Sequence, residues 1–406
     1  MPKRIHRLHL LVERTYARPI ARSLHWAAIL PLLTLLVAGC AQTAAQRRPT
    51  TQSPPSPTFA STTTPTPPPN LPTFSDWRVA YQSPDGILHA ITLDGKTDVA
   101  GPLLPGLITT GNQSTSAGAS PNGQMLAYDG DGGLVILGMS ADAIGSTNAR
   151  VAGMYEMFWS PDGSQVAISD GVGGLSVVVP ASGQPRPIPS PHGHVLGHLI
   201  GWIDGGHLAV EVVNSATAAT VGALDVITGE LRIIATIHSS ELGTYTYSLS
   251  PDGKTLLFSN SILGNDPYTP LVAKIDTATG VITPLPRIAN INRYSGFTSA
   301  AWRPGTEKIA VSTGFTANGD LKSWVLDLRN DTATHLLDGQ YVDGWAPDNG
   351  PLILTVSQKM PDNDIVIGGG PFTITAATIS SNGQVSTTVL TQQAMTFPFI
   401  GFVRTA

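Results

Sequence analysis

The chain repeats a short pattern in which an apolar stretch ends in a Ser-Pro-Asp-Gly turn and a second apolar stretch follows. Complete copies of the turn lie at 160–163 and 250–253, and residues 120–123 carry Asn in place of Asp. Looser copies are centred on Asp204, Pro304 and Pro347. Repetition at this spacing indicates a solenoid, a propeller or another array of small structural units.

Each copy of the repeat predicts one β-hairpin. Proline presets φ for the second position of a tight turn, aspartate bonds to the local backbone, and glycine supplies the positive φ that reverses the chain. The flanking β-branched and aromatic residues suit strands. A second hairpin is expected after the first, as at 223–234 and 273–283. Two hairpins supply four strands, which is the content of one propeller blade.

The spacing of the repeat predicts the number of blades. Successive turns are about 45 residues apart, and residues 77–406 divide into seven units of about 47 residues, whereas six units would need about 55. We therefore predict an all-β fold, a β-propeller of seven four-stranded blades. Six blades are expected at 117–151, 155–189, 198–237, 245–287, 297–337 and 341–391.

The seventh blade is expected to be split between the two ends of this region. Residues 77–81 read as a second strand that has no first strand before it, and residues 397–403 read as a first strand with no hairpin after it. Pairing between them would close the ring and cover two exposed sheet edges.

The repeat resembles the TolB-like, WD40-like (PD40) propeller repeats, whose signature is an apolar strand, Ser-Pro-Asp-Gly and a second apolar strand. The resemblance extends over residues 117–354, while Ser83-Pro84-Asp85-Gly86 is assigned to the next turn of its blade. It implies a propeller in the cell envelope that docks other proteins or forms part of a larger enzyme. It implies no catalytic residues.

Tryptophan recurs at one position of the repeat, directly before or near the turn. We interpret these residues as core side chains stacked between blades rather than as a carbohydrate platform. They are Trp159, Trp202, Trp302 and Trp345.

The N-terminus reads as a secretory signal. Residues 1–26 are basic, residues 27–38 are apolar but too few to span a bilayer, and small residues follow. The sequence Val37-Ala38-Gly39-Cys40 resembles the bacterial lipobox, which implies lipid on the Cys40 thiol and cleavage before it. Cys40 is the only cysteine of the chain, so it has no disulfide partner within it. We expect an extracytoplasmic lipoprotein, on the outer face of the cytoplasmic membrane or in the periplasm.

Three regions follow from these patterns. Residues 1–39 are the predicted signal peptide, residues 40–76 a lipidated Pro/Thr/Ser-rich segment, and residues 77–406 the propeller. The middle segment cannot bury enough apolar surface to fold, and it serves as a tether or a plain spacer. The chain has a formal net charge of −5, and the propeller region lacks a basic run, which argues against nucleic-acid binding.

One group of histidines is a candidate metal site. His192, His194 and His198, with His207 nearby, supply imidazoles at a spacing that zinc or copper sites use. However, we assign this segment to a connection between blades, and no carboxylate stands beside the trio to orient it. We predict no metal site and no cofactor.

Other candidate sites have simpler explanations. Residues 129–133 resemble a calcium loop without its later glutamate, and we expect a hairpin turn there. We read Asp362-Asn363-Asp364 as a solvated loop, and no Lys-Ser/Thr pair follows Gly368-Gly369-Gly370. The Gly-x-Ser-x-Gly elbow of the α/β-hydrolases is missing from the sequence. We therefore predict no catalytic residues.

Three functions agree with these observations. The leading hypothesis is a non-catalytic binding module, monomeric and lipid-anchored, that docks an envelope protein, peptide or glycan. The second is an extracytoplasmic enzyme, such as a lyase, lactonase or hydrolase, whose site lies in the central channel, where loops of several blades converge without a linear motif. The third is a structural subunit of an envelope complex.

Overall fold

The computed structural model describes most of the predicted propeller region. The described residues are 76–104, 117–130, 133–139, 146–149, 156–170, 173–215, 218–238, 244–261, 272–291, 297–314, 321–348, 350–357, 372–380, 383–394 and 399–404. All of them belong to one compact unit, Pro67–Ala406. The predicted signal peptide, Cys40 and the tether up to Ser75 lie outside the described residues.

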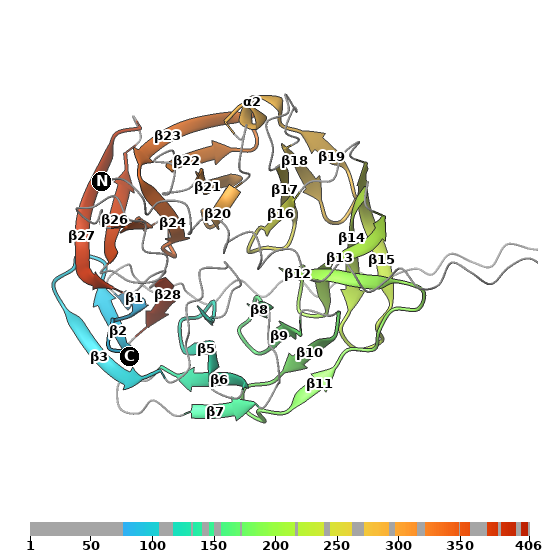
Figure 1. Cartoon of the computed structure of the whole chain (residues 1–406), viewed down its shortest axis with the longest axis horizontal. Coiled ribbons are helices and arrows are strands. Elements are labelled where there is room, and N and C mark those ends of the chain that lie inside the picture. The colour runs from blue at the N-terminus through green and yellow to red at the C-terminus, as the bar shows by residue number, and fades with distance from the viewer. Residues whose placement is uncertain are drawn as a thin grey trace, which may run out of the picture. The chain divides into compact units, whose positions relative to one another are not determined.

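Seven four-stranded antiparallel sheets surround a common centre, so the predicted seven-bladed propeller is confirmed (Figure 1). We number the sheets as blades 1 to 7 and give the strands of each from the centre outward. Blade 1 contains β28 (Phe399–Arg404), β1 (Trp77–Gln82), β2 (Ile87–Thr92) and β3 (Asp98–Leu103). Blade 2 contains β4 (Ala117–Ala119), β5 (Met125–Gly130), β6 (Gly133–Gly138) and β7 (Ser146–Ala149). Blade 3 contains β8 (Glu156–Trp159), β9 (Val166–Ser169), β10 (Leu175–Val178) and β11 (Pro185–Pro187).

The other four blades follow in chain order. Blade 4 contains β12 (Val195–Trp202), β13 (His207–Ser215), β14 (Ala218–Asp225) and β15 (Leu231–His238). Blade 5 contains β16 (Thr244–Leu249), β17 (Thr255–Ser261), β18 (Val272–Asp276) and β19 (Ile282–Pro284). The short helix α2 (Pro286–Ala289) leads to blade 6, which contains β20 (Phe297–Trp302), β21 (Lys308–Thr313), β22 (Lys322–Asp327) and β23 (Thr332–Asp338). Blade 7 contains β24 (Gln340–Trp345), β25 (Leu352–Ser357), β26 (Phe372–Ile379) and β27 (Val385–Ala394).

The ends of the propeller region close the ring as the sequence predicts. Strand β28 pairs antiparallel with β1, with Trp77 opposite Arg404 and Val79 opposite Phe402 (Figure 1). The backbone N–H of Arg404 also donates to the carbonyl of Gly123 in blade 2, at 2.9 Å. Blade 1 is therefore built from both ends of the region, and neither β1 nor β28 is left with an unpaired edge at this seam.

The Ser-Pro-Asp-Gly sequences at 160–163 and 250–253 form the predicted turns between the first and second strands of their blades. In blade 3, Ser160 Oγ donates to Asp162 Oδ1 (2.6 Å) and accepts the backbone N–H of Gln165 (3.0 Å). Gly163 has φ +71° and closes the turn by donating to the Ser160 carbonyl. The serine hydroxyl thus donates to the aspartate side chain and accepts from a backbone N–H, which explains why the turn carries serine. Residues 83–86 lie between β1 and β2, as expected.

The turn glycine also packs against the preceding blade. Gly253 has φ +69°, and a Cβ at this position would lie 1.8 Å from the carbonyl oxygen of Ile203 in blade 4. A side chain is therefore excluded twice, by the backbone conformation and by the neighbouring backbone. The glycine of the repeat is therefore required by the packing between blades as well as by the turn.

The recurring tryptophans join neighbouring blades. In three of them the indole Nε1 donates a hydrogen bond to the first strand of the preceding blade. Trp159 donates to the Gly118 carbonyl, Trp202 to the Phe158 carbonyl and Trp302 to Ser248 Oγ, each at 2.9 Å. Trp345 differs, because it donates to the Gly350 carbonyl within its own blade at 3.0 Å. Trp202, Trp302 and Trp345 are buried core side chains, as predicted, and Trp159 is partly buried against the core. Three of the four also bond across a blade boundary.

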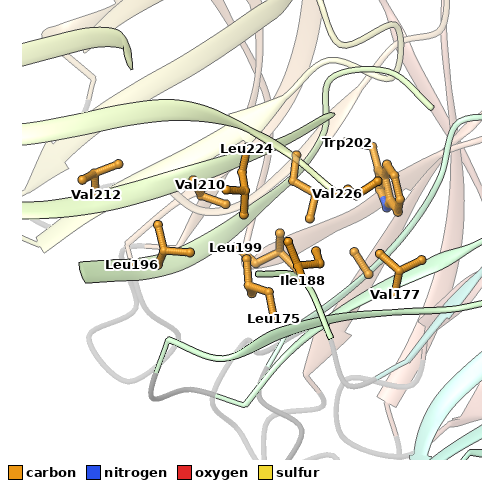
Figure 2. Close-up of a cluster of buried hydrophobic side chains, with 12 residues drawn as sticks. Leu175, Val177, Ile188, Leu196, Leu199, Trp202, Val210, Val212, Leu224 and Val226 are labelled. Atoms are coloured by element: carbon orange, nitrogen blue, oxygen red, sulfur yellow. The ribbon is translucent and has the colours of Figure 1, made fainter. Parts of the chain in front are cut away.

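The hydrophobic core lies between sheets rather than in the centre of the ring. One cluster of buried side chains fills the space between blades 3 and 4, with Trp202 and Val212 at opposite ends of it (Figure 2). A similar cluster joins blades 7 and 1 across the closure. Burial on both faces of each sheet accounts for the near-continuous apolar strands of the repeat.

Candidate functional site

The first strands of all blades run in the same direction, so they begin at the same end of the ring. We call this end the entry face; the Ser-Pro-Asp-Gly turns of blades 3 and 5 lie at the opposite end, which we call the turn face. Blade 4 has the longest inner pair of strands, β12 with eight residues and β13 with nine. Its residues at the entry face form the candidate site.

His198 is held at the boundary between blades 3 and 4. It lies on β12 where the pairing with β13 shifts register, between Leu196 and Leu199. Its Nδ1 lies 2.7 Å from Glu156 Oε1, and because a carboxylate only accepts, the nitrogen carries the proton. The other oxygen of Glu156 accepts the backbone N–H of Leu199 at 2.6 Å. The bulge thus directs the imidazole to a carboxylate of the preceding blade.

A second carboxylate approaches the same imidazole from β13. Glu211 Oε2 lies 4.0 Å from His198 Nε2, beyond hydrogen-bonding distance but close enough for attraction between charges. Tyr247 of blade 5 donates its hydroxyl to Glu211 Oε1 at 3.1 Å. Gly197 leaves room for this carboxylate, since a Cβ there would lie 2.9 Å from Glu211 Oε2. Three adjacent blades therefore contribute to one polar group.

The electrostatics of this group favour the imidazolium form. The hydrogen bond to Glu156, with the charges of Glu156 and Glu211, raises the pKa of His198 above its ordinary value against the opposing effect of burial. The His198 side chain is 52% exposed, whereas Glu156 and Glu211 are 12% and 15% exposed. The histidine is thus the accessible member of the group.

Two exposed valines continue the site along the same strands. Val195 and Val213 face each other across β12 and β13 and are 64% and 54% exposed. Directly opposed side chains in antiparallel strands lie on one face of the sheet. The entry face of blade 4 therefore presents an apolar pair next to a charged and hydrogen-bonded group, a combination typical of binding surfaces.

Known structures share this fold. A protein from Lactobacillus plantarum matches with 15% sequence identity and a TM-score of 0.51, over 80% of this chain and 98% of that chain. A chain of the mitotic checkpoint complex matches with 18% identity and a TM-score of 0.50, over 70% of this chain and 81% of that chain. The fold is a seven-bladed β-propeller of the WD40-like kind. At these identities the likeness concerns the fold alone. No family model and no curated protein sequence matches the chain.

The histidine trio of the sequence analysis is not brought together as a metal site. His192 and His194 are exposed before β12, and His198 turns to Glu156. Within the part of the chain that the structure describes, no group of three or more His, Cys, Asp or Glu side chains is placed to hold a metal ion. The expectation that no carboxylate stands beside the trio is wrong for His198, because its partners come from β8 and β13. His207 contacts Asp204 instead, at 2.9 Å.

Two of the remaining candidate sites lie wholly outside the described residues, namely Asp362-Asn363-Asp364 and Gly368-Gly369-Gly370. Of residues 129–133, the described members end β5 and begin β6, in agreement with the predicted hairpin. No helix among the described residues is long and apolar enough to cross a bilayer.

One acid that the sequence analysis did not single out lies on an inner strand. Asp343 of β24 accepts a hydrogen bond from the Thr355 hydroxyl and remains partly exposed. Burial of the carboxylate raises the pKa of Asp343 to about 7, against the opposing effect of this hydrogen bond. An acid of this pKa near the centre of a propeller can give and take protons at neutral pH. Nothing in the local sequence marks it, because its burial arises from the neighbouring strands.

Proposed function

We propose that this chain is a bacterial lipoprotein of the cell envelope whose propeller is a non-catalytic docking module. On this account Cys40 carries the lipid, residues 41–76 form the tether, and the entry face of blade 4 contacts an envelope protein, peptide or glycan. The observation that carries the docking role is the exposed Val195–Val213 pair beside His198 and Glu211. The lipobox resemblance at residues 37–40 and the TolB-like repeat support the location.

The chemistry of the site suits recognition. An exposed apolar pair supplies favourable burial on contact, and the partly buried carboxylates and the imidazole supply directional polar contacts. Glu156, Glu211 and Tyr247 are already hydrogen-bonded, so the surface is preorganised before a partner binds.

A pull-down from detergent-solubilised membranes tests the docking role. Wild-type chain should retain one or more stable envelope partners, and Val213→Glu should lose them. Ile227→Glu is the matched control, because Ile227 is 71% exposed in the β14–β15 turn at the turn face. Equal retention by both variants would contradict the assignment of the entry face.

Mass spectrometry of the native N-terminus tests the lipid anchor separately. An intact, unmodified Met1–Gly39 segment would exclude the anchor.

Asp343 supports a second candidate function, that of an extracytoplasmic propeller enzyme with its site in the central channel. A carboxyl on an inner strand with a pKa near 7 is the type of group that general acid–base catalysis uses. Screening the chain against lactone, polysaccharide and ester substrates at pH 7 tests this function. Turnover that Asp343→Asn abolishes would favour the enzyme over the docking module.

A further inference from the structure

Strand β27 differs from the other outermost strands of the propeller. The outer edge of a sheet carries unpaired backbone groups, and natural proteins protect such edges with short strands, prolines or charges. Six outer strands carry one of these protections: β3 has Asp98 and Pro102, β7 is short, β11 and β19 contain proline, β15 has Arg232, and β23 has Asp338. Strand β27 has ten residues, Val385–Ala394, with neither proline nor charge.

The first half of β27 is regular and exposed. Residues 385–389 pair one for one with β26, from Ile379↔Val385 to Thr375↔Val389, and the register shifts of this pair come only after Val389. Residues 386–389 are all exposed, and Val389 is 51% exposed. A regularly paired outermost strand with exposed residues can accept a further strand at its edge.

The turn before β27 determines which backbone groups are free. The backbone N–H of Ser380 donates to the Gln384 carbonyl at 2.9 Å, so these two residues form a hydrogen-bonded pair. Such pairs alternate along an antiparallel ladder. Val385 and Thr387 therefore direct their N–H and C=O groups away from β26, toward the open edge, whereas the Val389 carbonyl lies beside Gly95 of blade 1, where a Cβ would be 3.2 Å from its oxygen.

The sequence of this edge is nearly palindromic. Val385-Ser386-Thr387-Thr388-Val389 aligned antiparallel with itself about Thr387 places Val opposite Val, Thr387 opposite Thr387 and Ser386 opposite Thr388. Matched β-branched pairs and Thr–Thr or Thr–Ser pairs stabilise antiparallel strands, and no like charges oppose each other. The outward backbone groups of Val385 and Thr387 fall in hydrogen-bonded positions of this alignment.

We infer that β27 pairs with β27 of a second copy of this chain, antiparallel and about a two-fold axis at Thr387. The result is a symmetric dimer with a continuous eight-stranded sheet across blade 7 of both copies. This departs from the monomer expected from the sequence. The inference does not depend on the docking function.

Sedimentation velocity of the full chain in detergent, over a concentration series, tests the dimer. Wild-type chain should self-associate, and Thr387→Lys should raise the dissociation constant at least tenfold, because two lysines would then face each other at the axis. Thr334→Lys on β23 is the control, an exposed position of another outermost strand. Any association through the lipid segment is common to all three proteins, so it cancels in the comparison.

Each outcome decides the inference. A wild-type chain that stays monomeric at the highest concentration, or a Thr387→Lys dimer as tight as that of Thr334→Lys, overturns it. Thermal unfolding by circular dichroism should show that both variants fold as the wild type does. Thr387→Pro gives a second test, because the one backbone N–H that it removes points outward, so it should also weaken the dimer.

Discussion

Trp202 Nε1 donates a hydrogen bond to the carbonyl of Phe158, 2.9 Å away and 44 residues earlier in the chain. The bond crosses from blade 4 to the first strand of blade 3, and the same contact recurs from Trp159 to Gly118. The tryptophan of the repeat is thus a link between successive blades.

We expect Trp202→Phe to reduce the free energy of unfolding by about 2 to 3 kcal/mol, through lost ring volume and an unsatisfied carbonyl. Trp77→Phe is the control, because Trp77 is equally buried but its Nε1 has no hydrogen-bond partner. It should cost about 1 kcal/mol less. Urea unfolding measures both; equal losses would show that the interblade bond contributes nothing.

Gly253→Ala should be strongly destabilising, by about 3 kcal/mol or more, because the new Cβ meets the rigid Ile203 carbonyl. Gly305→Ala separates the steric clash from the backbone strain. Gly305 has nearly the same φ, +68°, but no atom lies within 4 Å of its Cβ position. That variant should cost only the backbone strain, about 1 to 2 kcal/mol. Thermal unfolding of the two variants should rank them in this order.

Asp343 should make stability fall as pH rises. Its folded-state pKa of about 7 is above the value of 3.8 for an unperturbed aspartate, so the unfolded state ionises first. The destabilisation by the ionised Asp343 carboxylate is absent below pH 4 and complete above pH 7. Asp343→Asn should therefore stabilise the fold at pH 8, by about 1 to 3 kcal/mol once partial solvation is allowed for, and change little at pH 4. Urea midpoints at the two pH values measure it.

His198 also makes stability fall as pH rises, but over a different pH range. Its pKa is raised in the folded state, so its contribution is fully present below the unfolded value near 6.5 and is lost as pH rises through the folded value. Glu156→Gln should lower the pKa of His198, since Glu156 is the main cause of the shift. An NMR titration of the imidazole protons measures both values. An unchanged pKa in the variant would contradict the assigned contact.

The fold was predictable because the residues that specify each hairpin lie close together in the sequence. Each Ser-Pro-Asp-Gly turn combines a preset φ, a hydroxyl cap and a positive-φ glycine within four residues, so hairpins such as β8–β9 are visible in the sequence. The closure was predictable too, because residues 77–81 and 397–403 each lacked a partner strand.

The candidate site was only partly visible, because its contacts are not local. His198 was singled out, but Glu156 lies 42 residues earlier and Tyr247 lies 36 residues after Glu211. The repeat spacing predicts which blades are neighbours, yet it does not predict the bulge that turns His198 toward Glu156. The raised pKa of Asp343 likewise arises from the packing of several strands.

Site-specific photocrosslinking in the native envelope tests the docking account most directly. A benzophenone side chain replaces Val213 in one protein and Ile227 in another, which places exposed probes on the entry face and the turn face. The account predicts a discrete crosslinked partner from position 213 and none from position 227. Crosslinks from position 227 alone, or equal yields from both positions, would contradict it.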